Sequence, residues 1–448
     1  MSRCARLAAV ALLTLWLTPL QAQSRWTYGA GAHFEVYTTG GDAVARRALE
    51  DFDRVHAYFE QLLRIPALTG PRTHLIVFSS RDEFAPYAAN AAVQAFYQSS
   101  PDGDFIVLPG LGRDAFRAVA HEYVHLASRR SGRRYPLWLD DGLADYFSTV
   151  TAQGTKLQVG AAPADRQKAL GFGVRLMPIE KLFAITRDSA EYTTPSRAAL
   201  FYAQSWALTH MLITDERYRD RSAALFARLA HGEPAALALT TTYDKPVSAI
   251  ASDLTKYALR GYYRTSLIDV ALPATVATTA ASTRTASDFE AGVRMADLLA
   301  ANPRHHADAR AAFDTLERER PDDLLLVESE AMFAVRTRRF DDARPYLEHA
   351  IALNTANARI YVHLADIRSA TDHQYFSAED ENALVAKALA LAPDDAEVQI
   401  QAARSLVRQR RGPEALAMLA AITRVPTEYE PLFADTKAAA MRLGGAAP

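Results

Sequence analysis

The sequence predicts an α+β domain followed by an all-α domain of helical repeats. Two observations lead to this fold class. Short strand-like runs stand among amphipathic helices before residue 265, whereas only helical patterns follow residue 288. Between these parts, residues 266–287 are rich in Thr, Ala and Ser and poor in large apolar side chains, so we expect a linker there. The predicted domains are therefore residues 23–265 and 288–448.

The first domain shows its strands and helices by their periodicity. Polar and apolar residues alternate over residues 33–39, which indicates a strand, and apolar residues at helical spacing predict a helix over residues 42–64. Apolar runs predict two more strands at residues 73–80 and 104–108. We expect the remaining helices at residues 113–130, 137–149, 178–186, 196–214, 219–230 and 245–262. A few strands ahead of a mostly helical body are typical of an α+β domain.

The second domain contains a weak internal repeat. Ala309 and Ala343 each begin an A-x3-F/L pattern, and they stand 34 residues apart. A period of 34 residues, with small residues where paired helices touch, resembles the tetratricopeptide repeats. The third unit, residues 358–392, contains a short insertion around residues 372–380. The Trp and Gly positions typical of that family are not kept, and a generic helical bundle is the alternative interpretation.

Charge and cysteine content exclude several classes of function. The chain has 448 residues, with 50 Lys and Arg against 52 Asp and Glu, a formal net charge of −2. This balance gives no basic footprint for nucleic acid. A single Cys can form neither an internal disulfide nor a cysteine-rich zinc module. A transition metal would therefore have to be held by some of the 12 His and by carboxylates.

The first 22 residues have the pattern of a secretory signal peptide. Arg3 and Arg6 precede an apolar run over residues 7–17, and small or neutral residues lead to a cleavage position after Ala22. The run is shorter than the ~20 residues that a membrane span needs. We therefore expect an exported protein, periplasmic or secreted, with no membrane span after signal removal; an uncleaved N-terminal anchor is the alternative. Cys4 would leave with the signal.

The most informative motif is HEYVH at residues 121–125, an HExxH within the predicted helix 113–130. His121 and His125 are four residues apart, so both imidazoles lie on one helix face and can reach one metal ion. Glu122 stands beside them and can take a proton from a metal-bound water. The alternative is a helix with two surface His and an unrelated Glu.

The sequence after this motif resembles the gluzincin metallopeptidases. Residues 138–147 read WLDDGLADYF and are similar to the W-L-x-E-G-x-A-x-Y segment of that family, whose Glu is the third zinc ligand. The order of HEYVH, this segment, MPIEKLF (177–183) and YAQSWALTHML (202–212) resembles the peptidase MA-like gluzincins over about residues 33–230. The resemblance implies a zincin-like fold for residues 23–265.

The resemblance implies Zn²⁺ as cofactor, with His121 and His125 as ligands. Asp141 occupies the position of the third ligand, where the family has Glu. Asp is a competent oxygen donor for zinc, but its side chain is one methylene shorter, so the second helix must approach more closely. The alternatives are that Asp140 or a water takes this place.

Three further roles follow from the resemblance. Glu122 is the expected general base. Asp145, four residues after Asp141 on the same helix face, is expected to accept the outer N–H of the first motif His. Tyr202 is the candidate for stabilising the oxyanion, since gluzincins often present a Tyr from a later helix. Tyr192 and His210 are the alternatives, and a helix-packing role is the other interpretation of Tyr202.

Taken together, these features predict an exported zinc metallopeptidase. Zinc would activate a water for attack on the peptide bond, with Glu122 as general base, and the helical repeats would bind the peptide or protein substrate or a partner protein. The alternative is a catalytically weak or inactive binding or assembly factor that acts through its repeats, which the Glu-to-Asp change at residue 141 favours. The intact HExxH argues for the enzyme.

Overall fold

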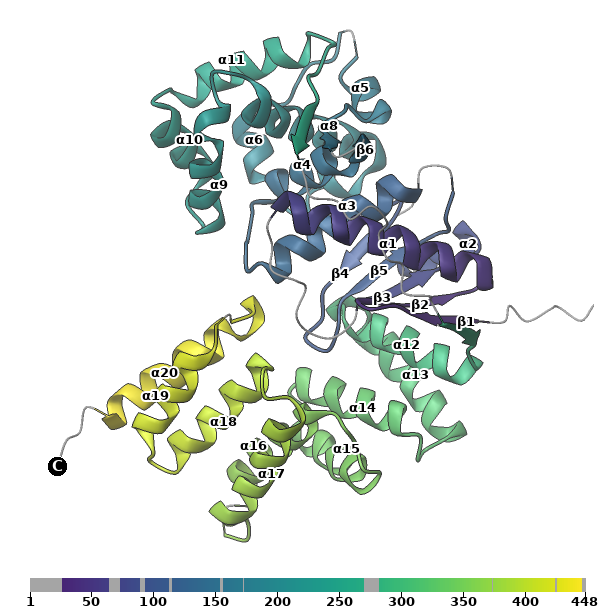
Figure 1. Ribbon diagram of the computed structural model, residues 1–448, viewed down its shortest axis with the longest axis vertical. Coiled ribbons are helices and arrows are strands. Elements are labelled where there is room, and N and C mark those ends of the chain that lie inside the picture. The colour runs from purple at the N-terminus through teal and green to yellow at the C-terminus, as the bar shows by residue number, and fades with distance from the viewer. Residues whose placement is uncertain are drawn as a thin grey trace, which may run out of the picture.

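The structure is a computed structural model that describes residues 26–63, 73–88, 93–112, 115–153, 156–171, 173–269, 282–372, 374–423 and 425–444. The expected signal peptide, with Cys4, lies outside these residues. The chain forms a mixed α/β N-terminal region followed by a largely helical region of paired helices (Figure 1). Within the described part of the chain, no helix combines the length and apolar character needed to cross a bilayer.

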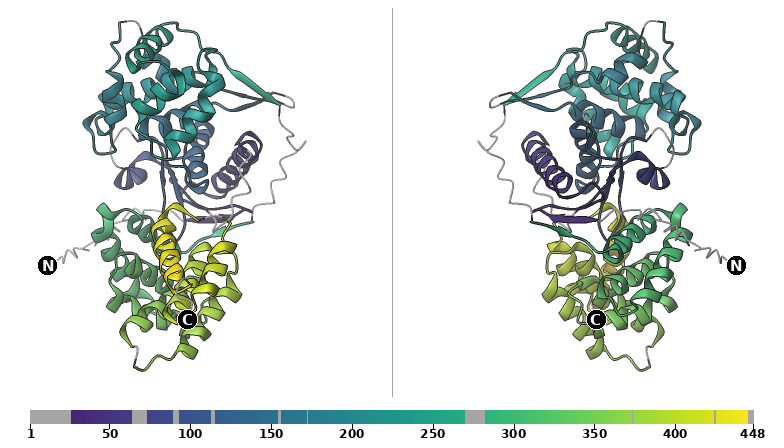
Figure 2. Two further views of the ribbon diagram at one scale, coloured as in Figure 1. Left: turned by 90° about the vertical axis from the view of Figure 1, so that its left-hand side faces the viewer. Right: turned by 90° about the vertical axis from the view of Figure 1, so that its right-hand side faces the viewer.

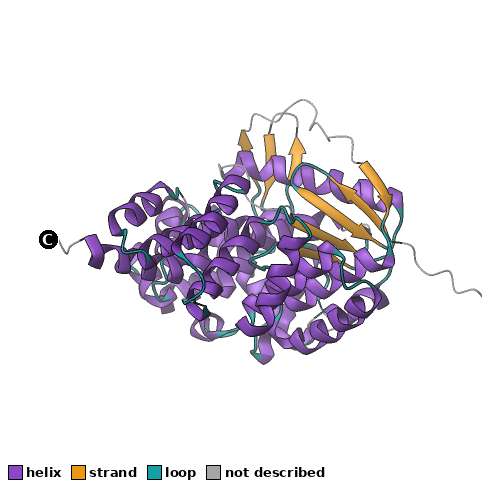
Figure 3. Ribbon diagram, turned by 90° about the horizontal axis from the view of Figure 1, so that it is seen from below, coloured by secondary structure: helices purple, strands orange, loops and turns teal. Residues whose placement is uncertain are grey.

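A six-stranded mixed sheet lies between an upper group of helices and the C-terminal helices in Figure 1, and its strands are orange in Figure 3. Its strand order is β4-β5-β3-β2-β1-β9. The inner strands β2, β3 and β5 are parallel, whereas β1, β4 and β9 run antiparallel to their neighbours. The strands are β1 (Thr27–Ala30), β2 (Phe34–Thr38), β3 (Thr73–Val77), β4 (Phe96–Gln98), β5 (Phe105–Leu108) and β9 (Ser282–Thr285).

Helices cover both faces of this sheet. Successive side chains of a strand point to opposite faces, and in β3 and β5 the side chains on both faces are apolar and buried. Leu75 and Ile106 pack in one buried cluster with residues of α1 (Asp42–Leu63) and α3 (Ala115–Arg130). Their chain neighbours Ile76 and Val107 pack on the other side, in a cluster that includes Met295 of α12 (Asp288–Ala300). The first helix of the C-terminal region thus completes the core of the N-terminal sheet.

A second group of helices surrounds the long buried helix α8 and is separated by α3 from the C-terminal helices (Figure 1). A small sheet of order β6-β7-β8 borders this group. The helices of the group are α4 (Leu137–Ser148), α5 (Ala164–Ala169), α6 (Ile179–Ala184), α7 (Ala190–Thr193), α8 (Pro195–Thr214), α9 (Ser222–Ala230), α10 (Ala235–Tyr243) and α11 (Val247–Ala258), and the strands of the small sheet are β6 (Thr151–Gln153), β7 (Lys156–Val159) and β8 (Ser266–Asp269) (Figure 2).

The segment expected to be a linker contains two strands. β8 pairs with β7 in the small sheet, and β9 pairs with β1 at the edge of the large sheet. Residues 270–281, between these strands, lie outside the described residues. The end of β9 leads directly into α12, so this segment ties the sheet to the helical region.

The C-terminal region consists of helices packed in pairs. Every second helix of this region begins at residue 288, 324, 358, 396 or 430, so the spacing is 36, 34, 38 and 34 residues. The four additional residues fall in the third pair, where the sequence indicates an insertion. The helices after α12 are α13 (His306–Glu319), α14 (Leu324–Arg336), α15 (Phe340–Ala352), α16 (Ala358–Thr371), α17 (Ala378–Leu391), α18 (Ala396–Arg408), α19 (Gly412–Ala421) and α20 (Glu430–Gly444).

The two regions are joined by ion pairs as well as by α12. Arg336 of α14 donates to the Ser100 hydroxyl at 2.7 Å and pairs with Asp102, both in the loop after β4. Arg129, in the last turn of α3, pairs with Glu428 before α20 at 3.2 Å. The helical pairs therefore contact the N-terminal region near its edge strand and at the end of the motif helix.

Candidate metal centre

Two adjacent helices, α3 and α4, bring the three predicted metal ligands together. His121 and His125 lie one turn apart on α3, with their Nε2 atoms 3.3 Å from each other. Asp141 on α4 places its Oδ1 atom 3.6 Å from Nε2 of His125. One ligand atom from each of the three residues lies within 4.8 Å of the others, so this group can hold a metal ion.

The spacing and burial of this group fit a small divalent cation. In a tetrahedral zinc site with Zn–N bonds of about 2.0–2.1 Å, two nitrogen ligands stand about 3.3 Å apart. The two Nε2 atoms have this separation. Asp141 is 3% exposed, its buried Oδ2 atom has no hydrogen-bond partner among the residues that the structure describes, and burial raises its pKa to about 6. A buried, unpartnered carboxylate oxygen is costly unless a cation compensates it.

The outer nitrogen of each His faces a carboxylate on α4. Nδ1 of His121 lies 3.2 Å from Oδ1 of Asp145, and Nδ1 of His125 lies 3.0 Å from Oδ2 of Asp140. Each carboxylate is placed to accept the Nδ1–H, which leaves the Nε2 lone pairs directed at the centre. Asp145 therefore lies where the sequence predicts it. Asp140, considered as an alternative ligand, contacts the outer nitrogen of His125 instead.

Asp145 is held in turn by Arg166 of α5. Asp145 is fully buried, and Arg166 donates to it through Nε at 2.7 Å and through Nη2 at 3.3 Å. Burial alone would raise the pKa of Asp145, but Arg166 and His121 hold it well below the ordinary value. Asp145 therefore stays ionised. No sequence pattern pointed to Arg166, which lies on the six-residue helix α5, 21 residues after Asp145 in the chain.

The proton on His125 depends on its carboxylate neighbours. Burial lowers the pKa of His125, but Asp140, together with Glu122 and Asp141, raises it to about 9. A metal ion at Nε2 must therefore displace a proton near neutral pH, so metal affinity increases with pH.

The predicted catalytic side chains surround the same place. Glu122 is 6% exposed, and its charge contributes to the raised pKa values of His125 and Tyr192. Tyr202 of α8 lies beneath the Arg166 guanidinium, with 4.8 Å from Cζ to the ring centroid, and 5.7 Å from the Tyr192 ring. Burial, and then the Asp141 carboxylate, raise the pKa of Tyr202. Its hydroxyl is therefore a neutral donor.

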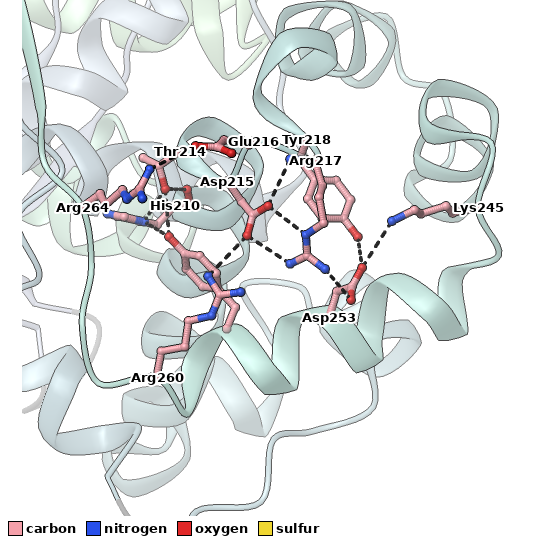
Figure 4. A network of polar contacts seen from close by, with 11 residues as sticks. His210, Thr214, Asp215, Glu216, Arg217, Tyr218, Lys245, Asp253, Arg260 and Arg264 are labelled. Atoms are coloured by element: carbon pink, nitrogen blue, oxygen red, sulfur yellow. Dashed lines mark hydrogen bonds and ion pairs between the residues drawn. The ribbon is translucent and has the colours of Figure 1, made fainter.

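His210, the other alternative to Tyr202, belongs to a separate buried network (Figure 4). Its Nδ1 atom lies 2.6 Å from the Tyr257 hydroxyl, and its Nε2 atom lies 2.8 Å from the carbonyl oxygen of Gly160. Burial lowers the pKa of His210 to about 4. Both ring nitrogens are engaged, so His210 links α8 to α11 and to the chain after β7.

Gly142 allows α4 to pack closely against α8. A Cβ atom at this position would stand 2.1 Å from Oγ1 of Thr209 and 2.7 Å from the carbonyl oxygen of Ser205. The absence of a side chain at Gly142, next to Asp141, therefore lets α4 and α8 approach closely.

Comparison of the chain with models of protein families gives no match, and a search of curated proteins finds no similar sequence. The assignment of the site therefore depends on its geometry and on the motif pattern.

Proposed function

We propose that this chain is a zinc-dependent metallopeptidase of the gluzincin type. The observation that supports it best is the two-sided arrangement of the histidines. Their Nε2 atoms converge with Asp141, while their Nδ1 atoms meet Asp145 and Asp140. Zinc, when bound, supplies Lewis acidity that brings the pKa of a water close to neutral.

The roles of the protein side chains follow from their positions. Glu122 accepts the proton of the attacking water and passes it to the leaving amine. The neutral hydroxyl of Tyr202, with Tyr192 beside it, donates to the carbonyl oxygen as negative charge develops there. Asp145 and Asp140 keep the two histidines in one orientation throughout.

An extended peptide is the substrate that best fits the neighbouring sheet. In the described part of the chain, β4 pairs on one side only, with β5, and it contacts the motif helix α3. An open strand edge can add an extended peptide through main-chain hydrogen bonds. A peptide on this edge would run beside α3, which carries His121, Glu122 and His125.

We further propose that the mature chain is exported and that its helical pairs bind substrate or a partner protein. Part of their surface is already engaged, since Arg336 and Arg359 contact the loop after β4. The alternative of an inactive binding factor rested on the short Asp141 side chain. Its Oδ1 atom nevertheless stands 3.6 Å from Nε2 of His125, which favours the enzyme.

Zinc content and hydrolysis, measured together, test the proposal. We expect about one zinc per chain without residues 1–22, and cleavage of an unstructured protein such as casein. Glu122→Gln should keep the zinc and lose activity by roughly 10²–10⁴-fold. Glu50→Gln on the exposed side of α1 is the matched control and should behave as wild type. Zinc-free protein, or hydrolysis indifferent to Glu122→Gln, would refute the enzyme.

A further inference from the structure

A short turn between α6 and α7 carries an exposed guanidinium to the rim of the metal centre. The Arg187 side chain is 67% exposed, and its Nη2 atom lies 3.9 Å from Oδ2 of Asp140. Among the described residues, the Arg187 guanidinium makes no hydrogen bond. Asp140 already meets His125 at 3.0 Å, so its long ion pair with Arg187 leaves the guanidinium donors available.

The groups around Arg187 are those of the proposed active site. The protein atoms around this accessible side chain displace part of its water and lower its pKa, but Tyr192, Asp141, Asp140 and Tyr202 together raise the pKa above the ordinary value. The charges of the proposed active site thus act on the guanidinium, which contacts Asp140, the neighbour of the candidate ligand Asp141. A group that contacts Arg187 would lie next to Asp140, at the rim of the proposed active site.

The backbone of this turn is fixed by its own hydrogen bonds. The Thr186 N–H donates to the Ser189 hydroxyl at 2.9 Å, and the Ser189 N–H donates to the Thr186 carbonyl at 3.0 Å. Asp188 pairs with Arg304, which precedes α13 in the helical region. The hydrogen bonds of the turn therefore fix the backbone that carries Arg187, while the N–H groups of its guanidinium make no hydrogen bond to the described residues.

We propose that Arg187 is a specificity-determining residue that binds a carboxylate of the peptide substrate beside the scissile bond. A guanidinium offers a planar set of N–H donors that matches a carboxylate in two-pronged geometry. The carboxylate is either an Asp or Glu side chain or the free C-terminus of the substrate. This inference rests on the proposed peptidase activity. The competing explanation is that Arg187 only supports Asp140, and through it the metal.

Direct binding tests this role without depending on turnover. The probes are fluorescein-labelled decapeptides of Ala and Ser. Each peptide carries a single Glu, or a single Gln as its uncharged counterpart, at one internal position, and each is made with a free and with an amidated C-terminus. Their affinity is measured by fluorescence polarisation on zinc-loaded Glu122→Gln protein. We expect a carboxylate at one position, or at the free C-terminus, to strengthen binding by roughly 10–100-fold, as for a hydrogen bond to a charged group.

The variants then assign that preference. Adding Arg187→Gln to Glu122→Gln should remove the preference, whereas adding Arg197→Gln, another exposed Arg of this region, should leave it intact. Amidation that abolishes the preference identifies the C-terminal carboxylate as the source; an effect of one internal Glu identifies the side chain. Zinc affinity should be the same with and without Arg187→Gln.

Three results would overturn the role of Arg187. One is that no peptide shows a preference for a carboxylate. Another is that the preference survives Arg187→Gln, and the third is that Arg187→Gln lowers zinc affinity, which would make it a supporting residue. The failure of wild-type protein to cleave any peptide would instead contradict the proposed function, while the binding comparison would still decide what Arg187 does.

Discussion

Asp145 connects three elements through one side chain. It sits on α4, meets Nδ1 of His121 on α3, and receives two hydrogen bonds from Arg166 on α5. We expect Asp145→Asn, which keeps the shape and removes the charge, to weaken zinc binding by roughly 10–100-fold. It should also lower the free energy of unfolding of metal-free protein by about 3 kcal/mol, since Arg166, whose side chain is 15% exposed, loses its fully buried counter-ion. Zinc competition titration and urea unfolding in EDTA measure the two effects.

Asp165→Asn is the matched control for Asp145→Asn. Asp165 also contacts Arg166, at 2.9 Å from Nη1, but its side chain is 49% exposed. An exposed pair of this kind contributes about 0–1 kcal/mol, so we expect little change in either measurement. Wild-type zinc affinity in Asp145→Asn would show that His121 needs no support from α4.

At the scale of single residues, the spacing of residues along the sequence predicts which side chains share a helix face. It does not predict which side chains meet because two helices pack together. Asp141 and Asp145 could be found because they stand four residues apart in a segment with a recognisable pattern. The contact of Asp140 with His125 depends on how α3 and α4 cross. That of Arg166 with Asp145 depends on where α5 lies in space.

At the scale of elements, Gly142 sets the distance between α4 and α8. We expect Gly142→Ala to destabilise the protein by more than about 2 kcal/mol, because the new Cβ would meet backbone and side-chain atoms well inside contact distance. It should also weaken zinc binding, since α4 carries Asp141. Urea unfolding with and without zinc is the measurement.

Gly292→Ala in α12 is the matched control for Gly142→Ala. There the nearest atom is Cδ2 of Leu316 at 3.1 Å, the end of a flexible side chain. This change should move the free energy of unfolding by no more than about 1 kcal/mol in either direction. Equal effects of the two substitutions would mean that the close contact between α4 and α8 is unimportant.

An ion pair between α16 and α18 should make stability depend on pH. Nε2 of His363 lies 2.9 Å from Oε1 of Glu397. Burial alone would raise the pKa of Glu397, but His363 and Arg359 lower it from 4.5 to about 2, so its stabilisation exists above pH 4.5 and declines toward pH 2. Glu397 raises the pKa of His363 above 6.5, so that contribution is complete below pH 6.5 and is lost as pH rises through the raised pKa.

The two contributions overlap between about pH 4.5 and 6.5. We expect Glu397→Gln to lower the free energy of unfolding there by roughly 3 kcal/mol, and by less at pH 3 or pH 9. Urea unfolding across this range measures the difference. Glu414→Gln, in an exposed pair with Arg411, is the control and should show little effect at any of these pH values. A loss that is equal at every pH would contradict the pairing.

The same scale shows which elements can be predicted from sequence. The strands expected at residues 33–39, 73–80 and 104–108 are present as β2, β3 and β5, whose side chains are almost all buried. The strands that the sequence analysis missed are β1 and the two edge strands, β4 and β9; most of their side chains are exposed or only partly buried, so no apolar run marks them. β9 also lies in a Ser/Thr-rich segment, where pairing with β1 outweighs composition.

At the scale of the whole molecule, the two regions share a core. The lower face of the sheet, with Ile76 and Val107, is buried by Met295 and Leu298 of α12, and β9 covers the edge of β1. A boundary drawn from composition alone at residues 266–287 separates parts that pack together, because no local pattern indicates which helix covers the second face of a sheet.

This shared core predicts how truncated chains behave. A fragment of residues 23–281 lacks β9 and α12, so it exposes an apolar sheet face; a fragment of residues 23–322 keeps β9, α12 and α13 and covers that face. We expect the shorter fragment to bind the dye ANS, to unfold without cooperativity and to hold zinc poorly. The longer fragment should unfold cooperatively and bind zinc as the full chain does. Cooperative unfolding of the shorter fragment would show that the N-terminal region folds without the helices that follow it.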